Sequence, residues 1–428
     1  MNQDKFPGTI FQVFPPVIRE SGGELSIDID LVEALQLYLE SFERVILACP
    51  VGRDGPDSSL KNCIPIDSLP AWASNLEIVP LPEAYKIRDF ARHFSNTRKL
   101  LRHHIQNAQY LEFFPCSLVG SWAGLACYEA MQLGRPYVVL ADIVYHERML
   151  FALQDKPFWK RWIKEKISIN LFKKYHQHIL KQSSLAILRG QEVYDEYASF
   201  CHRPHQIYHV TIAREDKIPT SLLEQKIAKL MSGRPLNISY AGRLIPIKGP
   251  LDWVRALHKA IDHNVDIRSV WLGDGSLLAE AQALAETLGI SQYIDFAGFV
   301  TDKNQLLKTL RESDIFLFCH KSRESPRCLI EALGSGCALV GYEGEYPKDL
   351  TETHGGALLV PVEDWEALGD LIIELDRDRS RLATLIRSAY KTGTFYEKEA
   401  AYMHHINLIR DFYSKLYPHL TNKVTVEV

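Results

Sequence analysis

Short apolar runs alternate with longer amphipathic stretches along the whole chain, and this rhythm limits the folds that the chain can adopt. Strand candidates lie at 9–14, 45–48, 76–79, 110–114, 137–140, 185–188 and 206–210, and again at 237–240, 269–272, 293–296, 315–318, 338–341 and 357–360. Helical stretches such as 31–40 and 118–133 lie between them. Continuous apolar strands separated by helices indicate parallel sheets covered on both faces. We therefore predict an α/β protein with two doubly wound, Rossmann-like parallel-sheet domains.

The boundary between the two domains is expected where a strand-like run gives way to polar sequence containing proline, at 213–232. A chain of 428 residues is too long for one ordinary core, which also favours two domains. We predict a first domain at 1–212, a second at 213–395, and a C-terminal helical segment within 396–428.

Composition excludes several classes of protein. The net charge of -4 gives no general argument for nucleic-acid binding. No apolar run is long enough for a transmembrane helix, and residues 1–8 lack the apolar core of a signal peptide. The eight cysteines form no CxxC motif and no Cys/His spacing typical of a zinc site, so we expect a reduced cytoplasmic protein without structural zinc.

The first motif that indicates chemistry is SYAGRLIPIKGPL at 239–251. A predicted strand ends at Gly242, and a short loop carries Arg243 and Lys248 before a helix begins near Pro250. Two cations at the carboxyl end of a parallel strand can stabilise a leaving diphosphate. Gly242 permits close backbone approach. The alternative is a surface loop with two solvated cations.

The second motif is ESPRCLIEALGSG at 324–336. Ser325 is a good N-cap and Pro326 a good first helical residue, so we predict that a helix starts here and carries Glu331 about two turns in. A helix N-terminus attracts phosphate and sugar oxygens, which makes Ser325 and Arg327 candidates for donor binding. Glu324 could accept bonds from sugar hydroxyls. Alternatively, Glu324 only complements the helix dipole and Glu331 is solvated.

The order of these motifs resembles glycosyltransferase family 4. Between them lie Gly273-Asp274-Gly275, the turn at 297–300 and SDIFLF at 313–318, so the close resemblance covers residues 237–356. The resemblance implies the GT-B fold, with two domains facing one cleft and the C-terminal helix crossing back to the first domain. It also implies that no metal and no cofactor besides a nucleotide-sugar co-substrate is required.

The resemblance assigns roles to individual residues. Arg243 and Lys248 would bind the donor diphosphate, Glu324 the donor sugar and Glu331 the ribose. Residues after the 297–300 turn usually hold the base, which here are Phe299 and Val300.

One departure concerns the glutamates, because the family usually has seven residues between them and this chain has six. Counting back from Glu331, the usual position of the first glutamate is occupied by Arg323. Either the loop is one residue shorter and Glu324 still faces the sugar, or its role has lapsed. We favour the first reading.

The first half fits the family more loosely. Gly22-Gly23 has the form of the glycine pair that follows the first strand in relatives, where backbone N–H groups lie near the donor diphosphate, so the resemblance makes both glycines donor-binding candidates, although most such pairs are only turns. Ala141 stands where many relatives have a histidine before an aspartate. Asp142 and His146 could orient the acceptor or assist proton transfer, or they could be a capping aspartate and a surface histidine.

The segment 156–181 holds eight Lys or Arg against one acidic residue, Glu165, with Phe158, Trp159 and Trp162 interleaved. A basic amphipathic helix with tryptophan can lie on a membrane surface. It can equally pack its aromatics inward and leave its lysines in water.

We therefore predict a glycosyltransferase that moves a sugar from a nucleotide sugar to a hydroxyl acceptor with retention of configuration. The acceptor could be a glycan, a lipid-linked saccharide or a small molecule, and peripheral contact with the inner membrane face stays open. Two alternatives are a sugar-nucleotide epimerase of the same fold and a non-catalytic sugar-nucleotide-binding or partner protein. NAD chemistry is disfavoured because no predicted strand is followed by GxGxxG.

Overall fold

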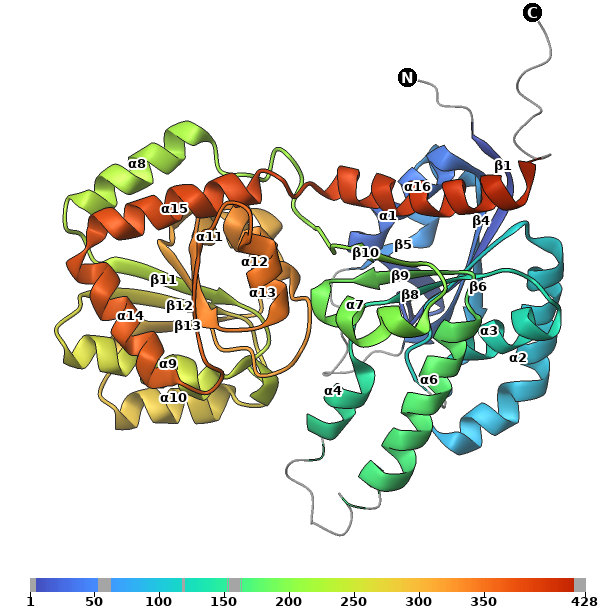
Figure 1. Ribbon diagram of the computed structural model, residues 1–428, viewed down its shortest axis with the longest axis horizontal. Coiled ribbons are helices and arrows are strands. Elements are labelled where there is room, and N and C mark those ends of the chain that lie inside the picture. The colour runs from blue at the N-terminus through green and yellow to red at the C-terminus, as the bar shows by residue number, and fades with distance from the viewer. Residues whose placement is uncertain are drawn as a thin grey trace, which may run out of the picture. The chain divides into compact units, whose positions relative to one another are not determined.

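A computed structural model describes residues 5–52, 63–117, 120–151, 153, 162 and 164–418. The chain forms two compact units, each of which is an α/β body in Figure 1. Unit 1 comprises residues 1–208 and 401–428, and unit 2 comprises residues 209–400. The division falls after Tyr208 rather than after residue 212, and the C-terminal segment joins unit 1 from Ala401 onward.

Unit 1 is built on seven parallel strands. Their order is β10 (Pro204–Ile207), β9 (Leu185–Arg189), β8 (Val138–Ala141), β7 (Tyr110–Phe113), β1 (Phe6–Val13), β4 (Phe42–Gly52) and β6 (Leu76–Leu81). Each strand predicted in the first half overlaps one of these.

Apolar residues on both faces of these strands explain why helices cover both sides. Along β1, Ile10 packs into one core cluster and Phe11 into the other. The Phe11 side is covered by residues of α2 (Ile87–Asn107), α3 (Trp122–Gln132) and α6 (Asn170–Gln182), and the Ile10 side by α1 (Ile29–Ser41) and α16 (Lys398–Leu416). Ile10 and Phe11 lie on opposite faces because successive side chains of a strand point to opposite sides of the sheet.

The parallel arrangement is not complete, because three short strands extend the sheet of unit 1. β2 (Ile18–Ser21) pairs antiparallel with β3 (Glu24–Asp28), which pairs antiparallel with β5 (Cys63–Pro65). Gly22 and Gly23 form the two-residue turn of this hairpin, with φ of 61° and 86°. Both residues of such a turn require positive φ, which glycine adopts without strain. The glycine pair therefore turns a hairpin, and α1 begins only after β3.

Helix α16 is fastened to strand β7 at two points. His405 Nε2 lies 2.8 Å from Oε1 of the fully buried Glu112, whose Oε2 accepts bonds from Gln12 and Tyr38. Farther along α16, the Tyr413 hydroxyl accepts a bond from the Leu111 N–H at 2.9 Å. Burial alone would raise the pKa of Glu112. The opposing charge of His405 and the three hydrogen bonds lower this pKa by more than burial raises it, so the net shift is downward.

Helix α3 begins later than the sequence suggested. Leu118, the expected start, lies outside the described residues, and the helix starts at Trp122 with Ser121 as its N-cap. The Ser121 hydroxyl accepts a bond from the Gly124 N–H, which satisfies one free donor of the first turn. At its other end Gly134 has φ of 62°, as the sequence Gly-Arg-Pro predicts.

Unit 2 has one six-stranded parallel sheet, part of which is labelled in Figure 1. The order is β13 (Ile294–Gly298), β12 (Ile267–Leu272), β11 (Leu236–Ala241), β14 (Ile315–Phe318), β15 (Ala338–Tyr342) and β16 (Ala357–Val360). β12 and β14 flank β11, so the strand order reverses at β11. In an open parallel sheet, ligands bind beside the carboxyl ends of the strands at such a point.

Two groups of helices pack around this sheet. α9 (Pro250–Asp262) packs against α10 (Leu278–Thr287) and α14 (Trp365–Arg377), whereas α15 (Arg379–Gly393) packs against α8 (Thr220–Met231) and α12 (Arg327–Gly334). The remaining helices are α11 (Lys303–Glu312) and α13 (Glu345–Thr351).

Candidate functional site at the carboxyl edge of the second sheet

The loop after β11 holds the two cations that the sequence singled out. Arg243 is exposed and has no salt-bridge partner among the residues that the structure describes. Lys248 is buried, at 8% exposure, in the short 3₁₀ turn Pro246–Lys248. The same loop therefore presents one cation to solvent and withdraws the other from it.

Glycine at position 249 is required by both conformation and space. Gly249 has φ of 62° and caps the start of α9, and a Cβ there would lie 2.4 Å from the carbonyl oxygen of Cys319. The N–H of Lys321 donates to the Ile247 carbonyl at 2.8 Å. These contacts hold the Arg243/Lys248 loop against the segment that follows β14.

A second glycine loop, Gly273-Asp274-Gly275 after β12, supports the first loop from the other side. Leu244 donates to the Asp274 carbonyl at 3.0 Å and accepts from the Leu277 N–H at 2.9 Å. A Cβ on Gly275 would lie 2.4 Å from the Leu244 carbonyl oxygen. The glycines allow the two backbones to touch, which fixes the loop before any ligand arrives.

Lys248 and Glu324 meet across the ends of β11 and β14. The ammonium group of Lys248 contacts Oε1 of Glu324 as a hydrogen-bonded ion pair, with only 10% and 19% of the two side chains exposed. Despite the shortened spacing between the glutamates, the structure thus directs Glu324 toward the cationic loop. Arg323, at the position reached by counting back from Glu331, is half-buried.

Helix α12 starts one residue later than predicted. Its first residue is Arg327, and Pro326 in extended conformation is the cap, with no side-chain capping bond. Ser325 is therefore outside the helix rather than its N-cap. Glu331 lies about one turn into α12, not two, because the helix begins at Arg327.

Glu331 is half-buried and accepts a hydrogen bond from the Thr211 hydroxyl at 2.6 Å. Thr211 lies between buried Val210 and Ile212, and Ile212 packs against Gly334 near the end of the same helix. The carboxylate is thus oriented by the segment that opens unit 2, rather than being a freely solvated side chain.

A buried pair beneath the loop was not foreseen from the sequence. The Tyr240 hydroxyl lies 2.7 Å from His320 Nε2, at the ends of β11 and β14. Burial raises the pKa of Tyr240 well above its usual value, while burial and then the Lys248 charge lower the pKa of His320 well below its own. Tyr240 therefore stays protonated and His320 neutral, and the two side chains share one hydrogen bond. The sequence offered one sign of this pair, because Tyr240 and His320 are polar residues at the ends of two apolar strands.

Acid is expected to destabilise both units through histidines that are buried in the neutral form. His320 is one, and His176 of α6 is the other, stacked on Phe172 with its pKa lowered to about 4, chiefly by burial. The unfolded chain binds these protons near pH 6.5, so stability should fall as the pH drops below 6.5, by up to about 1.4 kcal/mol per pH unit and histidine. Denaturant unfolding at pH 7 and pH 5 measures this loss.

Each variant removes the titration of a single histidine. His176→Phe should flatten the acid dependence of unit 1, and His320→Gln that of unit 2, whereas replacement of the exposed His263 by Gln should leave the profile unchanged. An unchanged slope in the first two variants would contradict the assignment.

The two base-binding candidates follow β13. Gly298 has φ of 70°, which turns the chain at the strand end, and Phe299 after it is 49% exposed. Val300 is half-buried. Gly273 and Gly298 form an antiparallel bridge, so the Phe299 turn adjoins the glycine loop that supports Leu244.

In unit 1, Asp142 directly follows β8 and accepts a bond from the Tyr145 hydroxyl at 3.1 Å. His146 lies in α4 (Tyr145–Phe151) and is buried, not on the surface, with Nε2 3.6 Å from Glu196. Asp142 and His146 therefore stand near the carboxyl edge of this sheet. His146, Glu147 and Glu196 present ligand atoms within 4.8 Å of one another, although Lys173 lies 3.4 Å from Glu196 and already balances its charge.

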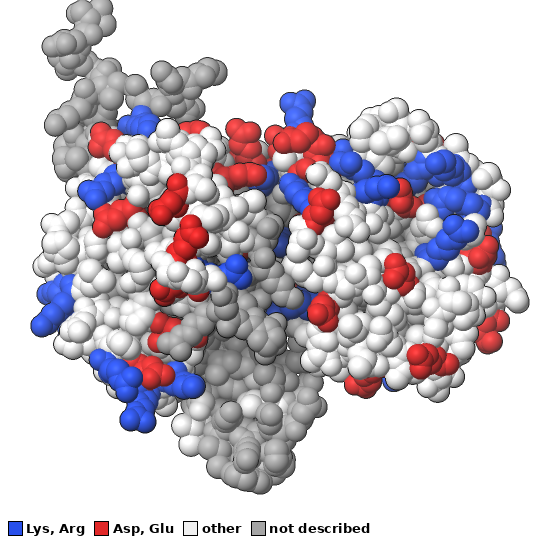
Figure 2. Space-filling view, turned by 180° about the vertical axis from the view of Figure 1, so that it is seen from behind, with Lys and Arg blue, Asp and Glu red and all other residues white. Residues whose placement is uncertain are grey.

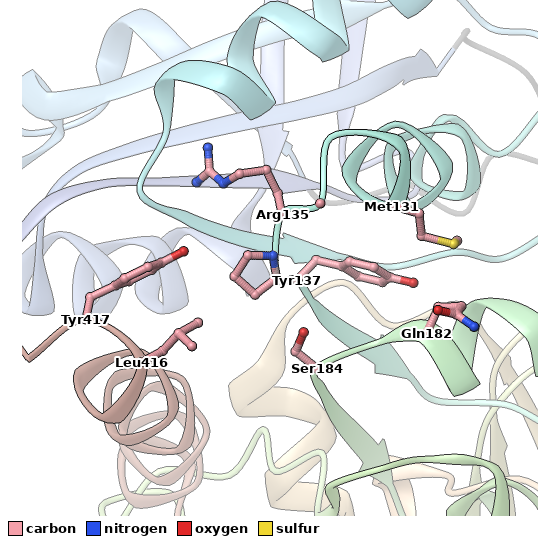
Figure 3. A pocket seen from close by; sticks show the side chains of 9 residues that line it. Met131, Arg135, Tyr137, Gln182, Ser184, Leu416 and Tyr417 are labelled. Atoms are coloured by element: carbon pink, nitrogen blue, oxygen red, sulfur yellow. The ribbon is translucent and has the colours of Figure 1, made fainter.

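A cavity of about 350 Å³ in unit 1 lies at the opposite edge of its sheet. Figure 3 shows Tyr137 and Gln182 on one side of it and Leu416 and Tyr417 on the other. Tyr137 and Ser184 directly precede β8 and β9, so this is the amino edge. The cavity is thus separate from every candidate residue above.

One face of the protein is mixed in charge. On the face shown in Figure 2, Lys and Arg side chains and Asp and Glu side chains both occur in many places. Within the described ranges, no helix is long and apolar enough to cross a membrane.

Comparison with known families gives a match to part of the chain. Residues 224–392 match the model of the glycosyl transferases group 1. The Vi polysaccharide biosynthesis protein VipC/TviE of Salmonella typhi is 33% identical over 98 residues, which is 23% of this chain. The chain covers only 16% of the length of that relative.

Solved structures match over nearly the whole chain. HepE of Anabaena in complex with UDP has a TM-score of 0.66 at 14% identity, covering 94% of this chain and 100% of its own. A glycosyltransferase from Rickettsia africae has a TM-score of 0.66 at 17% identity, covering 96% and 99%. These likenesses show the GT-B fold, and together with the matched domain they support a glycosyltransferase.

Proposed function

We propose that the protein transfers a glycosyl group from a nucleotide sugar to a hydroxyl acceptor with retention of configuration, as in glycosyltransferase family 4. The observation that carries the proposal is the meeting of Lys248 and Glu324 beside exposed Arg243, at the carboxyl edge where the strand order of unit 2 reverses. The matched group 1 domain spans all three residues.

The transfer reaction needs positive charge beside the bond that joins the donor sugar to its diphosphate. When the bond between the anomeric carbon and the diphosphate oxygen breaks, negative charge grows on the departing diphosphate. Arg243 and Lys248 supply two cations from one fixed loop, and groups that need no rearrangement stabilise such charge most effectively. The proposal therefore requires no metal and no further cofactor.

The carboxylates of Glu324 and Glu331 would accept hydrogen bonds from donor hydroxyls. Glu324, held by Lys248, would contact the sugar, and Glu331, oriented by Thr211, would contact the ribose. Ser325 and Arg327 lie at the start of α12, where the helix dipole favours anionic groups. Phe299 and Val300 would hold the base.

The acceptor would be held by unit 1, with Asp142 and His146 as candidates for orienting its hydroxyl or assisting proton transfer. In a retaining reaction of this type, the departing phosphate helps to deprotonate the attacking hydroxyl. UDP in the HepE complex supports a uridine donor as the first to test.

Thermal unfolding in the presence of UDP-, GDP- and ADP-sugars tests donor binding. One donor class is expected to raise the melting temperature of the native protein, since ligand at about 100 times its Kd stabilises by about 2.7 kcal/mol. The same donor should then yield a glycosylated product with an acceptor panel. Absence of any shift with all three classes would contradict the proposal.

The epimerase alternative differs in what happens without an acceptor. An epimerase would convert the nucleotide sugar to its epimer, whereas a transferase would release only a little free sugar by slow hydrolysis. A non-catalytic binding protein would give the thermal shift but no product with any acceptor. Analysis of the nucleotide sugar after incubation distinguishes the three.

A further inference from the structure

The α4–α6 projection of unit 1 is a surface that the transfer reaction does not explain. We use this name for α4, Trp162, the π-helical turn η3 (Lys164–Ile169) and α6. In Figure 1, α4 and α6 extend away from the sheet of unit 1, and α4 contacts η3.

Large apolar side chains of this projection are exposed rather than packed. Ile167 is 62% exposed, Leu171 55%, Trp162 53% and Met149 of α4 37%. Ile167 and Leu171 are four residues apart, which places them one helical turn apart on a single face. Exposed apolar residues that gather in this way mark an interaction site more often than isolated ones do.

The opposite face of the same helix explains how it is held. Ile169, Phe172, Ile179 and Leu180 are all buried, at 4% exposure or less. The helix therefore has an inner apolar face that anchors it to unit 1 and a second, outer group of apolar residues that this packing does not use.

Basic residues accompany the outer apolar group. Lys166, Lys174 and Lys181 are exposed on the same segment. The sequence 156–181 contains eight Lys or Arg and a single acidic residue, although the chain as a whole has a net charge of -4. The positive charge is thus a local feature that does not reflect the general composition.

The projection starts from the carboxyl edge of the unit 1 sheet. α4 follows β8 after only three residues, Asp142 among them, and so leaves the sheet at the edge where ligands of parallel sheets bind. α4 therefore begins on the same side of the unit 1 sheet as Asp142.

We infer that the α4–α6 projection docks the protein on an anionic lipid surface, with Trp162, Ile167 and Leu171 entering the interface and Lys166 and Lys174 meeting the headgroups. Exposed apolar side chains flanked by lysines match the boundary between acyl chains and anionic headgroups. A protein partner would need acidic residues around an apolar pocket. The excess of Lys and Arg in 156–181, with Lys166 and Lys174 exposed, favours the lipid surface, which presents anions at every point.

Sedimentation of the full chain with lipid vesicles tests this inference without using the enzymatic reaction. The protein should bind vesicles of phosphatidylcholine and phosphatidylglycerol in equal parts, and bind phosphatidylcholine vesicles much more weakly. Replacing Lys166 and Lys174 by Gln should weaken binding roughly 25-fold, because each lysine near an anionic surface contributes about five-fold. Binding should also weaken as salt is added.

A second variant probes the apolar contacts. Ile167→Ser with Leu171→Ser should reduce vesicle binding at least about ten-fold, since both side chains would lose their burial in the interface. The matched control is Ile87→Ser, a change at another isoleucine of unit 1 that is 74% exposed, and it should bind like the unchanged protein. Unfolding curves confirm that all variants stay folded.

Several results would overturn the inference. Equal binding to both kinds of vesicle, or full binding by the Lys166/Lys174 and Ile167/Leu171 variants, would remove the assigned surface. Failure to bind either vesicle, together with self-association that Leu171→Ser abolishes, would instead assign the projection to contact with a second copy. None of these readouts depends on a donor sugar, so they are independent of the outcome for the transfer activity.

Discussion

Replacing Arg243 and Lys248 together by alanine is expected to abolish glycosyl transfer while unit 2 stays folded. Loss of one preorganised group that stabilises transition-state charge typically costs about 10²- to 10³-fold in rate, so the double variant should fall by about 10³-fold or more. The single change Arg243→Ala is the cleaner probe, because Arg243 is exposed and its removal leaves no buried charge behind. Steady-state turnover of the donor identified by thermal shift measures the effect.

Lys248 needs its own control, since its removal also deprives the half-buried Glu324 of its partner. Lys248→Gln with Glu324→Gln removes both charges at once and separates a lost cation from an unpaired carboxylate. Arg268→Ala changes an exposed arginine at the amino edge of the same sheet and should leave turnover unaltered. Unchanged turnover in Arg243→Ala and Lys248→Ala would refute the assigned site.

The second large effect is expected at Glu112, which receives hydrogen bonds from Gln12, Tyr38 and His405. Glu112→Leu should destabilise unit 1 by about 3–5 kcal/mol, because three buried polar groups lose their acceptor and His405 loses its opposing charge. For a unit of this size that corresponds to a fall in melting temperature of roughly 10 °C. Calorimetry or circular dichroism measures it.

A surface carboxylate of the same sheet serves as the comparison. Glu77 of β6 pairs with Arg44 at 2.5 Å, with 37% and 56% of the two side chains exposed. Glu77→Leu should cost no more than about 1 kcal/mol, as exposed pairs usually do. If Glu112→Leu were as mild as Glu77→Leu, the attachment of α16 would have to rest on the Tyr413 hydroxyl and on apolar contacts.

The parallel core of both units could be predicted because its signal is local. Each strand is a short apolar run bounded by turn residues, and burial on both faces makes such runs continuous. The β2–β3–β5 extension was missed because IRES and ELSID are short and polar, and because the glycine pair between them was compared with a phosphate-binding loop. Two successive glycines with positive φ fit both a hairpin turn and a phosphate-binding loop. The pairing of the flanking strands decides between the two.

The residues of the candidate site also differ in whether their association is local in the sequence. Arg243, Lys248 and Gly249 lie within one loop, so their association was visible in the sequence. The Tyr240–His320 pair depends on β11 and β14 being neighbours, and the Glu112–His405 pair joins residues 293 positions apart. The sequence nevertheless indicated that Glu112 needs partners, because a carboxylate inside the apolar run YLEFF is costly to bury without hydrogen bonds or an opposing charge.

The two-point fastening of α16 also sets an order of assembly during synthesis. Unit 2 is contiguous in sequence, so all of its strands and helices have been made once residue 400 has left the ribosome. Unit 1 is interrupted, and its Ile10 face lacks Ile406, Ile409 and Phe412 until the last helix emerges. Although domains usually fold from the N-terminus onward, here the half that is made first is completed last. Until then Glu112 lacks His405, and that exposed apolar face is where a chaperone would be needed.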